Sequence, residues 1–284
     1  MSLVVNTNVA SLNAQRSLAS SGAELKTAME RLSSGKKINS AADDAAGFAI
    51  AERMTAQIRG LNMATKNAND GLSMLAVVEN ATNDVTDMLH RMRELAVQAS
   101  NSTNGSQDLG YLNDEVSQLK LEITRIAEQT KFNGTAYLDG DGAAAGGSVA
   151  GKFQVGTEAN QSINFTINNV GADSIGTTDG TQVSAINIST TTGAQDALQV
   201  ITDAIEQVAG DRATYGAIQN RLEYTVSNLM NVAEFTTAAR SRIEDADFAA
   251  ESARLAKAQV LQQTGVAMLA QANAAPELAM LLVK

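Results

Sequence analysis

Apolar residues recur at alternating steps of three and four positions over both ends of this 284-residue chain. Such steps place one apolar side chain per turn on the same helix face, and over this length they are typical of coiled coils. The runs cover residues 18–32, 51–75, 78–99, 109–126, 198–233 and 255–272. We therefore predict long helices at both ends, the last from Phe248 to about Ala274, where Pro276 is expected to stop it.

The middle of the chain, about 131–192, is rich in glycine, serine, threonine and asparagine and has a different pattern. Apolar residues alternate with polar ones at 153–155 and again at 163–167, which predicts a β-hairpin. Ile186 and Ile188 suggest one more short strand, and residues 171–182 offer little to bury and are expected to form an exposed loop. The predicted fold class is mainly α, a long antiparallel helical bundle or coiled coil at the paired termini with a small central β-hairpin region.

Two polar breaks divide the helical segments, at residues 33–44 and 240–247. The chain thus has a helical part up to about residue 130, a polar part at about 131–192 and a second helical part from about 193, and each break separates an outermost helix from the inner helix next to it. The outermost helices have apolar faces that no other segment is expected to cover, and an exposed face of that length indicates a partner surface. Copies that stack with a rotation that does not close form a helical filament. The predicted polymerisation seam consists of Leu18, Leu25, Met29, Leu32, Leu255, Leu261, Met268 and Leu269.

The composition disfavours several classes of catalytic and binding function. The chain has no cysteine, one histidine and a net charge of −10, which disfavours thiolate catalysis, cysteine-based metal sites and nucleic-acid binding. His90 has no neighbouring metal-ligand pattern, and Asp43 and Asp44 are better explained as helix caps than as catalytic carboxylates. We expect no enzyme activity, no cofactor and no metal. No apolar run is long enough to span a bilayer, and no Sec-type signal is evident.

Two long motifs carry a resemblance. Residues 31–47 read RLSSGKKINSAADDAAG, and residues 241–251 read SRIEDADFAAE, followed by LAKAQVLQQTGVAMLAQAN. With these motifs the chain resembles bacterial flagellin, the subunit of the flagellar filament. The resemblance implies that residues 1–43 and 241–284 form an inner-core coiled-coil domain and that residues 44–240 form a rod-like outer-tube domain. It implies a structural subunit that transmits motor torque for swimming.

The resemblance also implies where the chain works and with what. The expected location is the extracellular filament, reached through the flagellar type III export apparatus. The expected partners are other copies of the chain, the filament cap protein, the hook–filament junction proteins and a cytoplasmic export chaperone. The host Toll-like receptor for flagellin is a further expected partner, and the residues that match its recognition patch are Arg91, Leu95 and Glu115.

Modification of the polar middle region is a separate hypothesis. If that region is exposed, O-glycosylation is expected at Ser174, Thr177, Thr178 or Ser189.

Three alternatives stay open on the sequence. A hook–filament junction protein shares the terminal helices, but the two motifs fit flagellin better. A helical adaptor or signalling coiled coil predicts discrete oligomers and gives no reason for a hairpin insert. An enzyme needs a cluster of titratable residues, which is not evident. Basic residues near the two breaks, such as Arg31, Arg240 and Arg242, are either solvated or paired with acidic residues of neighbouring copies, with Asp43, Glu244 and Asp247 as candidates.

Overall fold

A computed structural model describes residues 7–140, 147–176 and 181–282, with side chains up to Ala274. The chain divides into two compact units. The first unit contains the chain up to Ile58 together with the chain from Glu234 onward, and the second spans Arg59–Ala233. These divisions lie within two long helices, whereas the polar breaks that we used for the predicted domains separate one helix from the next.

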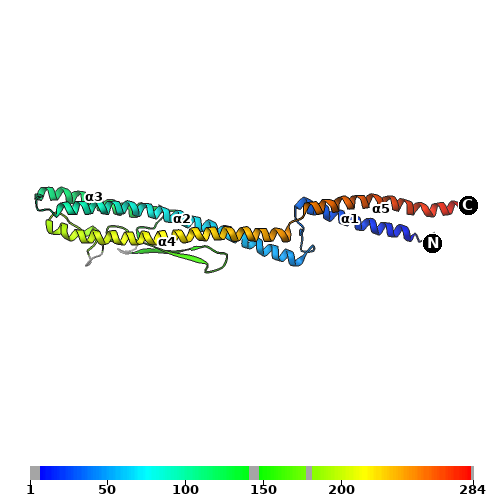
Figure 1. Cartoon of the computed structure of the whole chain (residues 1–284), viewed down its shortest axis with the longest axis horizontal. Helices are drawn as coiled ribbons and strands as arrows, with labels where there is room; N and C mark the ends of the chain where they lie inside the picture. Colours follow the sequence, from blue (N-terminus) through cyan, green and yellow to red (C-terminus); the bar gives the residue numbers. More distant parts are fainter. Residues whose placement is uncertain (1–6, 141–146, 177–180, 283–284) are drawn as a thin grey trace. The chain divides into compact units, whose positions relative to one another are not determined.

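In the first unit, the two terminal helices lie side by side and run antiparallel (Figure 1). Helix α1 spans Val9–Ser34 and helix α5 spans Phe248–Leu282. The side chain of Asn8 caps α1 by accepting a bond from the backbone N–H of Ser11, and Gly35 ends it in the left-handed conformation at φ 71°. The prediction that Pro276 stops α5 is wrong: proline removes one N–H donor, and the helix continues past it on the remaining bonds.

The neighbouring residues Asp43 and Asp44, at the first polar break, have different structural roles. Asp44 is the N-cap of helix α2, Ala45–Ala99, because its Oδ1 accepts from the Gly47 N–H at 2.9 Å. Asp43 instead closes the preceding turn, accepting from the backbone N–H groups of Ser40 and Asn39, and these bonds lower the pKa of Asp43. The predicted capping role is therefore confirmed for Asp44, while Asp43 stabilises the connection itself.

In the second unit, α2 packs with α3, Ser106–Gln129, and with α4, Thr191–Glu244 (Figure 1). The buried residues follow the predicted steps, and the most enclosed large side chains include Leu75, Leu89, Met92, Leu95, Ile123, Ile201, Tyr215 and Leu222. One seam of apolar side chains thus holds the helices together, as the periodicity predicts.

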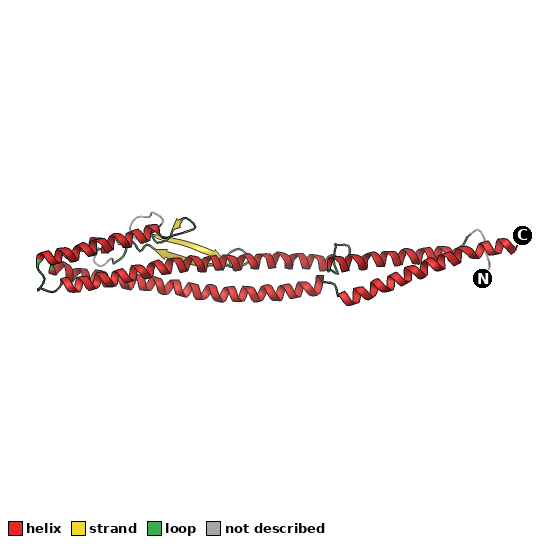
Figure 2. Ribbon diagram, turned by 90° about the horizontal axis from the view of Figure 1, so that it is seen from above, coloured by secondary structure: helices red, strands yellow, loops and turns green. Residues whose placement is uncertain are grey.

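The strands lie beside these helices (Figure 2). A small hairpin, β1 (Lys131–Phe132) and β2 (Thr135–Ala136), turns at Asn133–Gly134, where both residues have positive φ. The longer hairpin pairs β3, Ser148–Gln154, with β4, Ser162–Asn168. The inward residues of β4 are Ile163, Phe165 and Ile167, so the predicted alternation is confirmed.

The segment after the hairpin differs from its prediction. Ala172, Ser174 and Ile175 are buried, so the prediction of an exposed loop is wrong for residues 171–176. Ile186 and Ile188 do not form a strand. They follow a 3-10 turn, η2 (Val183–Ala185), and are buried at 5% and 0% exposure.

The backbone of residues 184–188 forms hydrogen bonds with side chains of α3, whereas a β-strand would bond to the backbone of a neighbouring strand. Lys120 Nζ donates to the carbonyl oxygens of Ser184 and Ile186, and the backbone N–H of Ile188 donates to Asn113 Oδ1 at 3.0 Å. Burial lowers the pKa of Lys120. Because α3 side chains supply the partners, the chain is held here without regular secondary structure.

Candidate assembly surface

Small residues form the contact between α1 and α5. Ala28 and Ala258 are each 1% exposed, and a Cβ atom added to Gly265 would lie 3.2 Å from the Cδ1 atom of Leu18. Ser11 and Ser21 are also buried on this face of α1. Side chains this short let the two helices approach closely, but they remove little apolar area from water.

Polar contacts fix the two ends of the pair. At one end, Asn8 Nδ2 donates to the carbonyl oxygen of Ala272 at 2.6 Å, and Ser11 Oγ donates to Asn273 Oδ1 at 2.7 Å. At the other end, Glu251 is 6% exposed and lies between Arg254, at 3.1 Å, and Arg31, at 3.9 Å. These contacts set the register of the antiparallel pair.

The structure places the eight predicted seam residues in two groups. Leu18, Leu25, Leu32, Leu255 and Leu269 are half-buried. Met29, Leu261 and Met268 are exposed at 57%, 41% and 66%. The predicted seam is therefore only partly covered within one chain.

Further exposed apolar side chains on the same pair were missed by the periodicity. They are Val9 and Leu12 on α1 and Phe248, Val260 and Val266 on α5, all more than half exposed. The steps of three and four select one face of a helix, so apolar residues on the other faces do not enter the pattern. Composition could have indicated these further exposed apolar residues on α5, because residues 258–276 contain no charged residue.

Helix α5 carries exposed apolar residues on both flanks of its contact with α1, at Leu261 and Met268 on one side and at Phe248 and Val266 on the other. Among the described residues, no helix is long and apolar enough to cross a membrane. Exposed apolar flanks of this kind can be buried against other apolar helices.

The residues of the predicted receptor patch meet in the second unit. Arg91 Nε donates to Glu115 Oε1 at 2.9 Å, and Arg91 Nη1 donates to Glu94 Oε2 at 3.0 Å. The bonds to Glu115 and Glu94 raise the pKa of Arg91. Leu95 is 1% exposed, so it lies in the hydrophobic core of this unit and not on the surface.

The four predicted glycosylation positions do not share one environment. Ser174 is 5% exposed, which makes it a wrong choice for a surface acceptor, and Ser189 is exposed. Thr177 and Thr178 lie outside the described residues.

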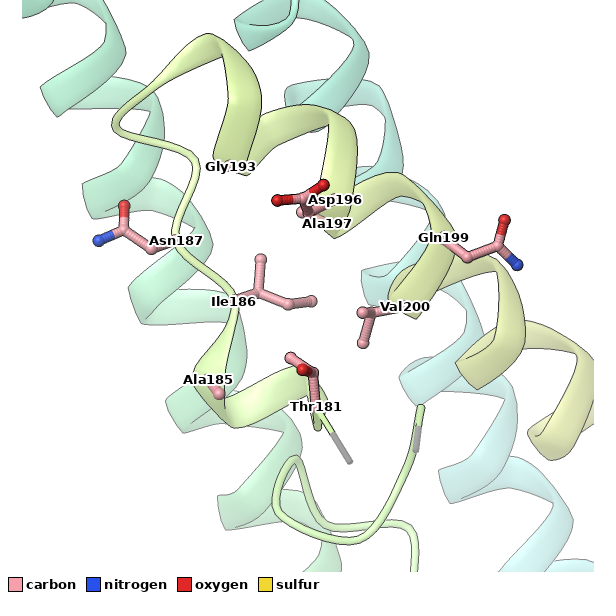
Figure 3. Close-up of a pocket in the computed structure, with 9 residues that line it drawn as sticks. All are labelled: Thr181, Ala185, Ile186, Asn187, Gly193, Asp196, Ala197, Gln199 and Val200. Carbon is pink, nitrogen blue, oxygen red and sulfur yellow. The ribbon is translucent and has the colours of Figure 1, made fainter. Parts of the chain in front are cut away.

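A hollow of about 450 Å³ lies between the segment around Ile186 and the first turns of α4 (Figure 3). Its residues are Thr181, Ala185, Ile186, Asn187, Gly193, Asp196, Ala197, Gln199 and Val200. Asp196 is the single titratable group among them. Within the described parts of the chain, no group of three or more histidine, aspartate or glutamate side chains is placed to hold a metal ion. The described residues that line this hollow do not include a nucleophile paired with a histidine or lysine base.

Comparison with known families adds independent findings. Residues 5–143 match the model of the bacterial flagellin N-terminal helical region, and residues 198–282 match the model of the C-terminal helical region. The chain is 41% identical to a flagellin of Halalkalibacterium halodurans, over 99% of this chain and 100% of that one. It is 42% identical to a Bacillus subtilis flagellin, over 96% and 97% of the two chains.

A solved structure described as a flagellar hook-associated protein of Vibrio parahaemolyticus also resembles this fold. The TM-score is 0.63 with 14% sequence identity, over 72% of this chain and 100% of the other. At that identity the likeness concerns the fold alone.

Proposed function

The chain belongs to the bacterial flagellin family and is a subunit of the flagellar filament, and we propose that it polymerises through the flanks of its paired terminal helices. The observation that carries the proposal is the exposure of Phe248, Val260, Leu261, Val266 and Met268 on helix α5, in which residues 258–276 carry no charged side chain. Copies of the same surface on neighbouring subunits would cover one another and bury these side chains.

The free energy gained by burying these side chains is large enough to contribute substantially to assembly. Eight large apolar side chains of α1 and α5 are between 41% and 66% exposed. At about 1.5–3 kcal/mol for complete burial of each, covering the exposed parts would contribute on the order of 10 kcal/mol per subunit. That is comparable with the roughly 4–15 kcal/mol that association costs in lost freedom, so the terminal surface supplies a main part of the driving force, and further contacts in the filament supply the rest.

The domain roles follow from this proposal. Residues 1–43 and 241–284 would form the inner core of the filament, and residues 44–240 would form its outer tube. Before assembly the apolar flanks need protection from water, which fits a cytoplasmic chaperone. Export through the type III apparatus, and partners at the cap and at the hook–filament junction, complete the proposed route to the extracellular filament.

Two surface roles belong to the same proposal. A host receptor of the Toll-like class would contact Arg91 and Glu115, which are both accessible, while Leu95 would support them from the core. For O-glycosylation, Ser189 is the predicted acceptor that combines exposure with the polar middle segment. The intact mass of native filaments tests the second role, since a mass equal to that of the bare chain excludes modification.

The hook–filament junction alternative is less well supported. The full-length relatives at about 40% identity are flagellins, whereas the likeness to a hook-associated protein is one of fold. No feature of the described surface favours the junction role over the filament role.

Seeded polymerisation tests the proposal. In the variant Leu261→Gln/Met268→Gln two exposed apolar side chains become polar, and both replacements are good helix formers. We expect an unchanged helical circular dichroism spectrum and at least a tenfold rise in the critical concentration for growth from filament seeds. The matched control is Leu121→Gln, which changes a side chain that is 65% exposed on α3. Equal critical concentrations for wild type and the double variant would contradict the proposed surface.

A further inference from the structure

Lys120 ties the segment that follows η2 to helix α3 in the second unit. Its Nζ atom donates to the carbonyl oxygen of Ser184 at 3.1 Å and to that of Ile186 at 2.9 Å. The bond to Ser184 lies at the surface, whereas the bond to Ile186 is partly buried. The amine of Lys120 is therefore held by two neutral groups and stays accessible to small molecules from one side.

The residues that flank Lys120 on its side of α3 are uncharged. They are the residues three and four positions away, which are the neighbours of a helical side chain: Val116, Ser117, Ile123 and Thr124. Burial of the amine therefore acts without the help that a nearby carboxylate would give to the charged form, and it lowers the pKa of Lys120.

The two carbonyl bonds are compatible with a neutral amine. An ammonium group has three N–H donors, and the amine left after loss of one proton has two donors and a lone pair. Both bonds, to Ser184 and to Ile186, can therefore persist when Lys120 is deprotonated. Because the two donors point at the carbonyl oxygens, the lone pair points away from them. A partly desolvated lysine with a free lone pair is an activated nucleophile.

We propose that Lys120 is a modification site whose amine accepts an acyl group from a small acyl phosphate. The lone pair attacks the carbonyl carbon of the donor and a C–N bond forms. The bond from that carbon to the phosphate oxygen breaks, phosphate leaves, and the nitrogen gives its extra proton to water. The donor has to be small because Lys120 is half-buried. This inference does not depend on the proposed assembly surface, since Lys120 and both carbonyl groups belong to the second unit.

Acylation changes what Lys120 can hold. The product is an amide with a single N–H, which can donate to only one of the two carbonyl oxygens. The other oxygen loses its partner, and this is costly near Ile186, which is 5% exposed. The backbone of residues 184–188 should therefore separate from α3 more often. The adjoining bond from the Ile188 N–H to Asn113 Oδ1 reports this separation.

Treatment of the purified full chain with acetyl phosphate tests the reactivity, with peptide mass spectrometry giving the initial rate at each lysine. We expect Lys120 to react at least threefold faster than Lys66 and Lys152, two exposed lysines of the same unit, because more of its amine is neutral. In guanidinium chloride the three rates should agree within a factor of two. A native rate at Lys120 no higher than at the other two would overturn the inference. An excess that persists in denaturant would do the same, since the fold would not be its cause.

Hydrogen exchange tests the consequence of acylation. Lys120→Met keeps a long, flexible side chain and removes every donor, and Lys120→Arg keeps the charge and the N–H donors. We expect the Ile188 N–H to exchange at least threefold faster in Lys120→Met than in wild type, and within a factor of two of wild type in Lys120→Arg. Unchanged exchange in Lys120→Met would show that the segment is held without this lysine. That result, or equal acceleration in both variants, would overturn the proposed release.

Discussion

Replacing Gly71 by alanine should destabilise the second unit, although the same change at Gly210 should stabilise it. Both glycines lie inside helices of this unit, in α2 and α4. In a helix interior, alanine is favoured over glycine by about 0.5–1 kcal/mol because glycine loses more conformational freedom on folding. An added Cβ at Gly210 meets no atom within 4 Å, so the full gain is expected there.

At Gly71 the space is already filled. An added Cβ would lie 3.0 Å from Cδ1 and Cε1 of Phe153. The Phe153 ring cannot move away freely, because it stacks on Phe165 with ring centroids 4.5 Å apart. Overpacking of this kind costs typically about 1–3 kcal/mol. After subtraction of the helix-propensity gain of about 0.5–1 kcal/mol, we expect a net loss of up to about 2.5 kcal/mol at Gly71, with a central value of about 1 kcal/mol.

Urea unfolding followed by circular dichroism measures both effects in one transition, since both glycines belong to the same compact unit. The variant Phe153→Leu supplies the decisive comparison. If the ring causes the loss, Gly71→Ala in that background should become neutral or stabilising, with a coupling energy of about 1–2 kcal/mol. A Gly71→Ala variant as stable as Gly210→Ala, or a loss unchanged by Phe153→Leu, would refute the reasoning.

Three further predictions concern stability. Asp44→Ala removes the N-cap bond of α2 and should lower the free energy of unfolding of the first unit by about 1 kcal/mol in chemical denaturation; no loss would contradict the cap. Leu95→Ala empties a buried site and should cost about 2–5 kcal/mol in urea unfolding of the second unit, whereas a surface role for Leu95 predicts almost no loss. Burial raises the pKa of Asp211 in the folded state, although a bond from Asn168 opposes the shift. Stability should therefore fall as pH rises from the unfolded pKa, about 3.9, through the raised folded pKa; Asp211→Asn should remove this component, and identical pH profiles would exclude it.

The helices of this protein were predictable because their pattern is local and repetitive. The runs at 109–126 and 198–233 correspond to buried faces of α3 and α4, since apolar side chains at steps of three and four must share one side of a helix. The alternation at residues 163–167 predicted β4 for the same kind of reason. Two long motifs were sufficient to identify the family.

The sequence-based predictions were wrong where residues distant in sequence supply the contacts of a segment. Residues 171–176 look polar and small, yet Ile175 is fully buried in the helical core. The backbone after η2 finds its partners in Lys120 and Asn113, which a strand prediction for Ile186 and Ile188 could not anticipate. The helix stop at Pro276 failed because a proline removes one backbone donor and leaves the other bonds of the helix in place.

The sequence by itself determined the helical ends, the hairpin, the family and the presence of an apolar surface too large for one chain to cover. Only the tertiary structure decided which parts of that surface remain exposed, because small residues such as Ala28 and Ala258 take the intrachain contact and leave Met29 and Met268 outside. Periodicity specifies the face of a helix on which a residue lies, but the neighbour of that face depends on how distant segments pack.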